Sequence, residues 1–186
     1  GIKWQTVAEQ TPVPHKGDPV DAARHKYICV NADEGDSGTF ADRMLMEGDP
    51  FCLLEGMAIA AHAVGADRGM IYLRSEYPAA IAVMSEAIEK ARDRGWLGQG
   101  ILGSSCNFDV TIRVGAGSYV CGEETAMLES LEGRRGTVRA KPPLPAIEGL
   151  FGTPTVINNV LTIASVPSIL ARGAEAYAAL GQERSR

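Results

Sequence analysis

The sequence feature that most constrains the fold is a regular alternation of short apolar runs with longer segments of helical periodicity. Residues 27–30 and 70–73 are apolar runs fit for buried strands, and 110–114 alternates apolar with polar residues. Each run is followed by a loop and then by a segment whose apolar residues recur every three or four positions. Strands that alternate with helices predict an α/β fold, with a parallel sheet flanked by helices.

Start and stop signals bound the first two helices. Asp49 is expected to cap a helix that begins at Pro50, because Asp suits the cap position and Pro the first helical turn. Gly65 is expected to end this helix. Ser75 is expected to cap the next helix, which Gly95 would end.

The remaining segments carry weaker signals. A helix is expected at 123–132, and a last one at about 158–171, which Pro167 would interrupt. Residues 1–26 are polar and carry three prolines, so an extended lead-in or loop is expected there. Residues 133–154, basic at first and then rich in proline, are expected to be irregular.

Length and charge limit the classes of function. With 186 residues the chain is long enough for one domain, residues 1–186, with its own core. A net charge of −5 argues against general nucleic-acid binding, because neutralising phosphates needs a basic surface. The apolar runs fall short of the roughly 20 residues of a membrane span, so no membrane insertion is expected.

The cysteine pattern predicts no metal site. None of the four cysteines belongs to a C-x-x-C pair, so no local zinc or iron–sulfur site is expected. Such thiols are typical of buried, reduced cysteines in a cytoplasmic protein. They are Cys29, Cys52, Cys106 and Cys121.

Two loops stand where parallel sheets bind ligands. Residues 31–38 follow the first strand and 115–124 the third, and ligands of such sheets lie beyond the carboxyl ends of the strands. The second loop is not the dinucleotide fingerprint, because Val120 stands where its last glycine belongs. Glu123 and Glu124 would repel a phosphate. They either accept hydrogen bonds from sugar hydroxyls or an amide, or complement the dipole of the following helix.

Three further groups each leave two interpretations open. The polar residues of 31–38 form either a solvated turn or a set of acceptors for polyol hydroxyls, and their spacing fails the calcium-loop pattern. Asn158 and Asn159 either cap a helix or donate amide N–H groups to an anion. The basic residues of 134–141 either are solvated or guide a phosphorylated ligand. The polar and basic residues concerned are Asn31, Asp33, Glu34, Asp36, Arg134, Arg135, Arg139 and Lys141.

Taken together, the motifs of the chain are far more specific than any one of them. The set resembles the flavin- and NADH-binding subunit of respiratory complex I, and its relatives in NAD-reducing hydrogenases and NAD-dependent formate dehydrogenases. The stretch at 31–40 is most similar to the beta subunit of soluble molybdenum formate dehydrogenases. The motifs, in order, are Lys3-Trp4, Asn31-Ala32-Asp33-Glu34, Asp42-Arg43, Glu55-Gly56-Met57, Leu73-Arg74, Glu76-Tyr77, Gly115-Ala116-Gly117, Cys121-Gly122-Glu123-Glu124-Thr125-Ala126, Ser130-Leu131-Glu132-Gly133-Arg134, Lys141-Pro142-Pro143 and Asn158-Asn159-Val160.

This resemblance implies noncovalently bound FMN in a Rossmann-like domain that exchanges hydride with NAD(H) and passes electrons to iron–sulfur clusters. It implies no acid–base side chain, since hydride transfer depends on placement, and Glu124 is expected to tune the charge of the pocket. Asp36 and Lys141 match positions that meet NAD(H). The residues implied for FMN are Lys3, Asn31, Asp33, Glu34, Tyr119, Gly122, Glu123, Glu124, Asn158, Asn159 and Thr162.

The resemblance also marks departures. In the family a glycine-rich loop precedes the position of Lys3, and a ubiquitin-like domain and the cysteines of a [4Fe–4S] cluster follow, so the chain is expected to be an internal fragment. Leu144 stands where many relatives have a Phe that stacks on adenine, which predicts a weaker adenine contact.

The resulting hypothesis is a cytoplasmic diaphorase subunit of an NAD-dependent formate dehydrogenase, which converts formate and NAD⁺ to CO₂ and NADH. Its implied partners are a molybdenum/iron–sulfur subunit and a [2Fe–2S] thioredoxin-like subunit. The alternative is the same module in complex I or an NAD-reducing hydrogenase. A structural module without cofactor is the alternative from another class, and the retained acidic residues and asparagines speak against it.

Overall fold

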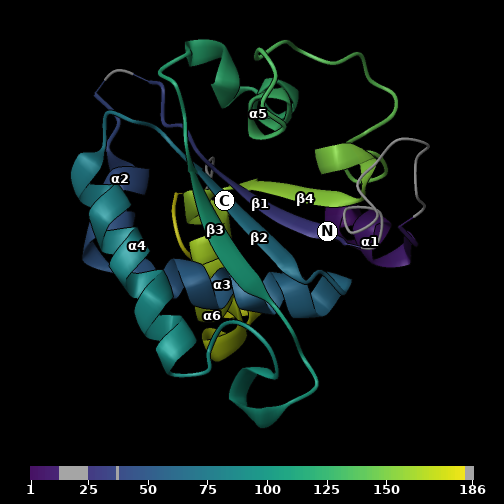
Figure 1. Cartoon of the computed structure of the whole chain (residues 1–186). Helices are drawn as coiled ribbons and strands as arrows, with labels where there is room; N and C mark the ends of the chain where they lie inside the picture. Colours follow the sequence, from purple (N-terminus) through teal and green to yellow (C-terminus); the bar gives the residue numbers. More distant parts are fainter. Residues whose placement is uncertain (13–24, 37, 183–186) are drawn as a thin grey trace.

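A parallel sheet forms the centre of the computed structural model, which describes residues 1–12, 25–36 and 38–182 (Figure 1). The strands lie in the order β3-β2-β1-β4, and every neighbouring pair is parallel. The predicted α/β fold is therefore confirmed. The strands are β1 (Tyr27–Ala32), β2 (Arg68–Leu73), β3 (Asp109–Val114) and β4 (Thr155–Asn159).

The order of the strands reverses between β1 and β4. From β1 the chain adds β2 and then β3 on one side, and it returns to place β4 on the other side of β1. Ligands of open α/β sheets bind at such a switch point, beyond the carboxyl ends of the strands. The topology therefore directs attention to the residues that follow β1 and β4.

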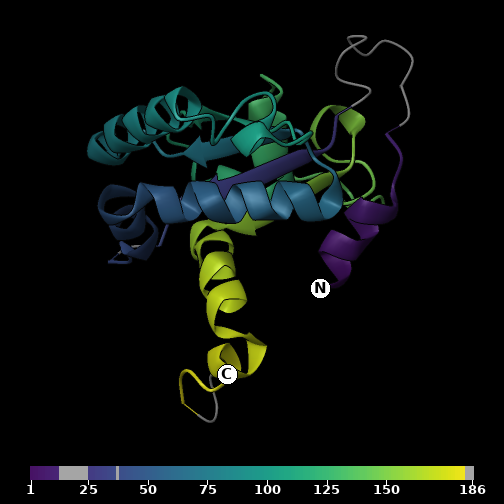
Figure 2. The same cartoon turned by 90° about the horizontal axis from the view of Figure 1, so that it is seen from below.

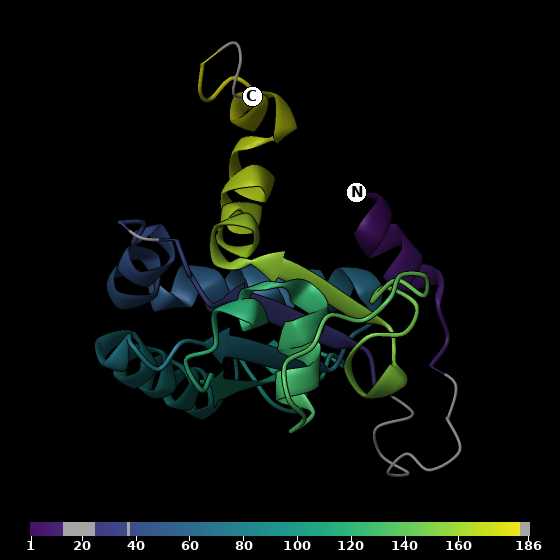
Figure 3. The ribbon, with the colours of Figure 1, turned by 90° about the horizontal axis from the view of Figure 1, so that it is seen from above.

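Helices cover the two faces of the sheet unequally. Figure 3 shows α5 in front of the sheet and α3 behind it, with α6 rising beside β4. In Figure 2, α6 stands out from the body of the molecule, with α7 at its far end. Within the described ranges, no helix combines the length and the apolar character that crossing a membrane requires. The helices are α1 (Ile2–Glu9), α2 (Ala41–Gly48), α3 (Pro50–Val64), α4 (Pro78–Asp93), α5 (Glu124–Leu131), α6 (Val160–Arg172) and α7 (Ala174–Ala178), with 3₁₀ turns η2 (Ile101–Gly103), η3 (Tyr119–Gly122) and η4 (Leu150–Gly152).

The alternation of side chains along β1 divides the core into two clusters. Ile28 and Val30 point to the face that α1, α2, α3, α4 and α6 cover, and Cys29 points to the face that α5 covers. Because Asn31 shares the direction of Cys29, its amide emerges on the α5 side at the end of the strand. The sheet thus presents a polar group toward α5 at its carboxyl edge.

The predicted limits of the first two helices are partly confirmed. The Asp49 carboxylate accepts a hydrogen bond from the Cys52 N–H at 3.2 Å, and Gly65 ends α3 with a φ of 72°. The prediction that Ser75 caps α4 is wrong. Tyr77 is the N-cap of α4, and the Ser75 hydroxyl donates to Glu76.

Three other expectations are also corrected. Residues 2–9 of the expected lead-in form helix α1, and residues 13–24 of it lie outside the described part of the chain. Residues 155–159 form β4, a strand that the sequence did not predict, and the helix expected from about 158 begins only at Val160, because pairing with β1 satisfies the backbone of 155–159. Pro167 lies inside a continuous α6 rather than interrupting it.

Packing against α3 explains how α6 accommodates its proline. Pro167 has no N–H to donate to the carbonyl of Ile163, one helical turn earlier. That carbonyl meets α3 at Gly56, where a Cβ would lie 2.2 Å from the Ile163 oxygen. Only glycine at position 56 permits this close approach of the two helices. The α3–α6 contact fixes the start of α6 against the end of β1.

Candidate functional site

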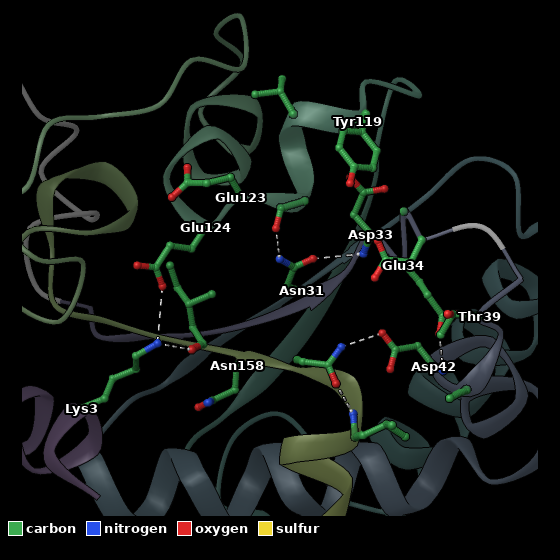
Figure 4. A pocket seen from close by; sticks show the side chains of 18 residues that line it. Lys3, Asn31, Asp33, Glu34, Thr39, Asp42, Tyr119, Glu123, Glu124 and Asn158 are labelled. Atoms are coloured by element: carbon green, nitrogen blue, oxygen red, sulfur yellow. Dashed lines mark hydrogen bonds and ion pairs between the residues drawn. The ribbon is translucent and has the colours of Figure 1, made fainter.

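A cavity of about 860 Å³ lies at the carboxyl ends of β1 and β4 (Figure 4). It is bounded by the loop after β1, the η3 turn, the start of α6 and the side chain of Lys3 from α1. Eleven of the thirteen predicted site residues line it, namely Lys3, Asn31, Asp33, Glu34, Asp36, Tyr119, Gly122, Glu123, Glu124, Asn158 and Asn159.

The two loops singled out in the sequence meet in this cavity. The side-chain amide of Asn31 donates to the carbonyl of Gly122 at 2.8 Å, which ties the end of β1 to the η3 turn. The ring of Tyr119 lies over Gly35, where a Cβ would come within 2.8 Å of a ring carbon. A side chain at position 35 would therefore push Tyr119 away from the mouth of the cavity.

Glu123 combines a capping role with an ion pair to the loop after α5. One oxygen of its carboxylate accepts from the backbone N–H groups of Thr125 and Ala126, both at 2.9 Å, and so caps α5. The other oxygen lies 3.3 Å from the Lys141 ammonium. Burial opposes the charged form of Glu123, but these hydrogen bonds outweigh it and lower its pKa. The carboxylate is therefore ionised and already engaged.

Glu124 lies between two lysines. Its carboxylate is 2.6 Å from the Nζ of Lys141 and 3.4 Å from the Nζ of Lys3. Burial disfavours the charged carboxylate, but Lys141 and then Lys3 outweigh burial, so the pKa of Glu124 is lowered. Lys3 also donates to the carbonyl of Ile157 at 2.9 Å, which anchors it to the end of β4. Lys141 does not itself line the cavity and reaches Glu124 from the loop after α5.

The Glu34 carboxylate lines the cavity, but its hydrogen bonds are made within the protein. Its carboxylate accepts from the Asp42 N–H and the Tyr77 hydroxyl, each at 3.1 Å, so it holds the start of α2. Asp33 is nearer to solvent, and burial raises its pKa although Arg74 opposes that shift. Arg74 also donates to the carbonyl of Glu34, which fixes the loop after β1.

The two asparagines have separate partners. Asn159 is the N-cap of α6, because its side-chain oxygen accepts from the Leu161 N–H at 2.8 Å. The side-chain oxygen of Asn158 accepts from the indole N–H of Trp4 at 2.9 Å. Thr162 lies exposed in the first turn of α6, outside the cavity lining.

Most of the basic residues after α5 form ion pairs with carboxylates of the protein, so they are neither fully solvated nor free to guide a phosphorylated ligand. The Arg139 guanidinium lies 2.5 Å from Glu129 and 2.8 Å from Glu132, and Arg134 lies 2.6 Å from Glu129. Both arginines therefore hold the loop onto α5. Of the residues at 134–141, it is Lys141 that turns toward the cavity carboxylates.

Asp42 is a site residue that sequence reasoning missed. It lines the cavity with only 3% of its surface exposed, and its carboxylate accepts from the side-chain amide of Asn159 at 2.7 Å. Burial raises its pKa to about 6, and the neighbouring Glu34 adds to the shift, while hydrogen bonds from Asn159 and the Leu161 N–H oppose it. The sequence marks Asp42 only as part of the Asp42-Arg43 motif, because a residue's burial cannot be read from its type.

A parallel sheet with a polar cavity at its switch point defines the class of α/β domains that bind nucleotide cofactors. Residues 2–168 match the family model described as the Nuo51 FMN-binding domain, and the chain belongs to this family. The resemblance stated from the motifs is therefore confirmed.

Two curated relatives and one solved structure place the chain within larger proteins. It is 52% identical over 185 residues to an NADH-quinone oxidoreductase subunit of Rhizobium meliloti (strain 1021), covering 100% of this chain and 41% of that protein. It is 48% identical over 186 residues to the NADP-reducing hydrogenase subunit HndC of Solidesulfovibrio fructosivorans, covering 100% of this chain and 36% of that protein. The crystal structure of an NAD⁺-reducing [NiFe]-hydrogenase in the H₂-reduced state matches with a TM-score of 0.81 and 39% identity, covering 99% of this chain and 29% of that one. The chain thus spans about 40% of the length of the curated relatives it matches.

The cavity residues fit FMN in size and in chemistry. The volume lies within the range of roughly 300–1,000 Å³ that is usual for cofactor pockets. Carboxylate and amide oxygens at one end suit the hydroxyls of a sugar chain, and the N-terminus of α6 at the other end suits a phosphate. The family confirms the predicted FMN, and two of the three relatives are named for NADH or NAD⁺, in agreement with the predicted NAD, while the third is named for NADP. The predicted [4Fe–4S] cluster belongs outside these residues, which is consistent with the greater length of the relatives.

Proposed function

We propose that the chain is the FMN-binding domain, residues 1–186, of a cytoplasmic oxidoreductase subunit that transfers electrons between NAD(H) and iron–sulfur clusters. One observation carries the proposal. The acidic loop after β1, the acidic start of α5 and the asparagines before α6 meet in one cavity, in a chain of the Nuo51 FMN-binding family.

The phosphate end of the cofactor is assigned to the start of α6. Asn159 and Leu161 bring this helix N-terminus to the cavity, and the helix dipole favours an anion there. The side-chain oxygen of Asn158 is engaged by the indole N–H of Trp4, so the side-chain NH₂ of Asn158 is the group suited to donate to a phosphate. Thr162 lies exposed in the first turn of α6 outside the cavity lining, so a contact from it to the phosphate is the least supported of the proposed ones.

The sugar and ring end is assigned to the opposite side of the cavity. Asn31 and Asp33 offer oxygen acceptors at the end of β1, and Gly122 leaves the backbone of η3 open to close approach. Lys3 is held between Ile157 and Glu124 and supplies a cation at the boundary between the two ends. When bound, the flavin supplies hydride exchange with a nicotinamide and electron delivery to clusters.

The chain itself contributes orientation and charge. No side chain is required as acid or base, because placing the reacting atoms about 3–3.5 Å apart accounts for much of the effect. The carboxylate of Glu124 is masked by Lys3 and Lys141, and a nucleotide that attracts Lys141 would uncover it. An uncovered carboxylate repels the phosphates of the nucleotide and favours its release. Asp36, at the exposed rim, is the second residue assigned to NAD(H).

The test uses the full natural polypeptide that carries this sequence, purified with FMN supplied. We expect a flavin absorption spectrum with one FMN per polypeptide, bleaching by NADH, and NADH–ferricyanide activity. A folded polypeptide that stays colourless and inactive with FMN supplied would contradict the proposal and favour a structural module.

The substrate that exchanges electrons with the iron–sulfur clusters of the whole complex is a separate question. The relatives named above are NADH-quinone oxidoreductase and hydrogenase proteins, and they favour a complex of either type over the formate dehydrogenase hypothesis. The whole complex assayed with quinone, hydrogen and formate in parallel distinguishes the three. Activity with formate alone would favour the formate dehydrogenase hypothesis, with its molybdenum/iron–sulfur and [2Fe–2S] partner subunits.

A further inference from the structure

The buried acid Asp42 stands at the start of α6, where the proposed function puts the phosphate (Figure 4). Its carboxylate accepts from the side-chain amide of Asn159 at 2.7 Å, while the other end of that amide accepts from the Leu161 N–H at 2.8 Å. Asp42 therefore fixes which way the Asn159 amide faces. The same helix start must hold a buried carboxylate and receive an anion.

The groups around Asp42 do not offset its negative charge. From the loop after β1 it faces a second carboxylate, that of Glu34. From α6 it meets the uncharged Asn159 and the Leu161 N–H. The Tyr77 hydroxyl before α4 reaches Glu34 instead.

The charged groups on α2 and just before α3 have partners other than Asp42. On α2 itself the Arg43 guanidinium lies 2.9 Å from Glu47. Ahead of α3, Asp49 accepts from the N–H of Cys52 in its own helix. Two buried acids are thus neighbours at one end of the cavity, with no cation among the groups that act on Asp42 in the described part of the chain.

We infer that Asp42 is a proton-coupled positioning residue of the phosphate end of the FMN site, and that FMN binding protonates it by taking one proton from solvent. This inference rests on the proposed function. A phosphate beside the α6 N-terminus adds negative charge next to two carboxylates, and protonation of one of them removes the strongest repulsion. A protonated Asp42 would also gain an O–H donor that a phosphate can accept.

The direction of the pH effect follows from linkage. Burial already raises the pKa of Asp42 to about 6, and a bound phosphate raises it further because like charges repel. Between pH 7 and 8 Asp42 is ionised in the protein without FMN and must take up a proton on binding. The affinity for FMN should then fall by up to about tenfold per pH unit, the limit for one proton. A phosphate ester with a second pKa of about 6 is already about nine-tenths ionised at pH 7 and contributes little slope of its own.

The experiment measures FMN and riboflavin dissociation constants by quenching of flavin fluorescence, at pH 7.0, 7.5 and 8.0, on the full natural polypeptide. Asp42→Asn keeps an acceptor for Asn159 and removes the titrating group, and Glu47→Gln removes a carboxylate from the same helix away from the cavity. We expect the FMN dissociation constant to rise several-fold from pH 7 to 8 in the wild type and in Glu47→Gln. It should stay constant in Asp42→Asn, and riboflavin, which lacks the phosphate, should show no slope in any of the three.

Each outcome decides the inference. Equal FMN slopes in the wild type and in Asp42→Asn would overturn it while leaving FMN binding, and hence the proposed function, intact. A folded wild type that binds neither flavin would instead contradict the proposed function. If Asp42→Asn does not fold, calorimetry of the wild type at pH 7.5 in two buffers of different ionisation enthalpy decides. Uptake of about one proton with FMN and none with riboflavin supports the role of Asp42, and no uptake with FMN overturns it.

Discussion

The two ends of α5 carry charge in different ways. At the N-terminal end, Glu123 and Glu124 face the cavity and are paired with lysines over 2.6 to 3.4 Å. At the C-terminal end, Glu129 and Glu132 are almost buried and are paired with the guanidinium groups of arginines. One helix thus has a lysine-paired end and an arginine-paired end.

The kind of cation at each end of α5 indicates which end can rearrange when a ligand binds. A lysine is a single charge on a flexible stem, and it can leave one carboxylate for a phosphate at little cost. Arg139 forms contacts to Glu129, Glu132 and the carbonyl of Gly149 with three of its nitrogens, which a ligand cannot easily replace. We therefore expect the arginine-paired end to hold the fold and the lysine-paired end to serve the cofactor.

The largest expected effect is on stability, from Glu132→Ala. The Glu132 carboxylate has 6% of its side chain exposed, and it contacts Arg134 and Arg139 and accepts from the Phe151 N–H at 2.8 Å. Removing it leaves the Phe151 N–H without its acceptor and Arg139 with Glu129 as its one remaining carboxylate, so we expect the free energy of unfolding to fall by about 2–3 kcal/mol. Urea unfolding of the full natural polypeptide measures this. Glu124→Ala is the matched variant and should cost no more than about 1 kcal/mol; equal losses would erase the distinction between the two ends.

A smaller loss of stability is expected from Arg139→Lys. An ammonium can replace one of the three Arg139 contacts but not the planar arrangement, so about 1–2 kcal/mol of unfolding free energy should be lost with the missing hydrogen bonds. The reverse change at the other end, Lys141→Arg, should alter stability by less than about 0.5 kcal/mol. Lys141→Arg proving the more damaging of the two would mean that the lysine-paired end is the structural one.

Acid should destabilise the protein through the carboxylates at both ends of α5, because their pKa values are lowered in the folded state. The hydrogen bond from Arg134 is the main reason that the pKa of Glu129 is lowered, and the pKa values of Glu123 and Glu124 are lowered as well. A carboxylate with a lowered pKa in the folded state stabilises the protein above its unfolded pKa of about 4.3, and this contribution is lost as the pH falls through the folded pKa. Thermal unfolding between pH 6 and 3 should show the melting temperature falling below about pH 4.5. Glu129→Gln should flatten that decline, and an unchanged decline would exclude Glu129 as a source of it.

Little effect on stability, but a distinct effect on the ligand, is expected from Glu124→Gln. The variant keeps the shape of the side chain and removes one charge beside two lysines, so the free energy of unfolding should change by less than about 1 kcal/mol. The dissociation constant of NADH should fall about two- to tenfold, because less repulsion opposes the nucleotide phosphates. Calorimetric NADH titration and the flavin reduction potential measure this. If neither changes, Glu124 does not tune the site.

Much of the fold could be predicted because buried strands and capped helices leave local signals. The apolar runs of β1 and β2 and the Asp49-Pro50 helix start were visible in the sequence. The shared cavity of the two loops followed from the rule that parallel strands bring their carboxyl ends to one edge. Motif order and spacing pointed to the family, which no single loop could have done.

The features that were missed depend on contacts between distant residues. Helix α1 has only Val7 fully buried and is held by Trp4 on Asn158, a contact that local periodicity does not reveal. Strand β4 is short and ends in two asparagines, and its pairing with β1 rather than its composition makes it a strand. Asp42 gave no signal of its role because nothing in a local sequence marks an acid as buried.

Hydrogen–deuterium exchange of the full natural polypeptide, with and without FMN, tests most directly that FMN occupies the cavity at the carboxyl ends of β1 and β4. We expect FMN to slow exchange in peptides from 31–36, 119–124 and 158–162 together, while peptides from 98–107, at the opposite end of β3, stay unchanged. Slowed exchange confined to residues outside those three segments, with FMN bound, would contradict it.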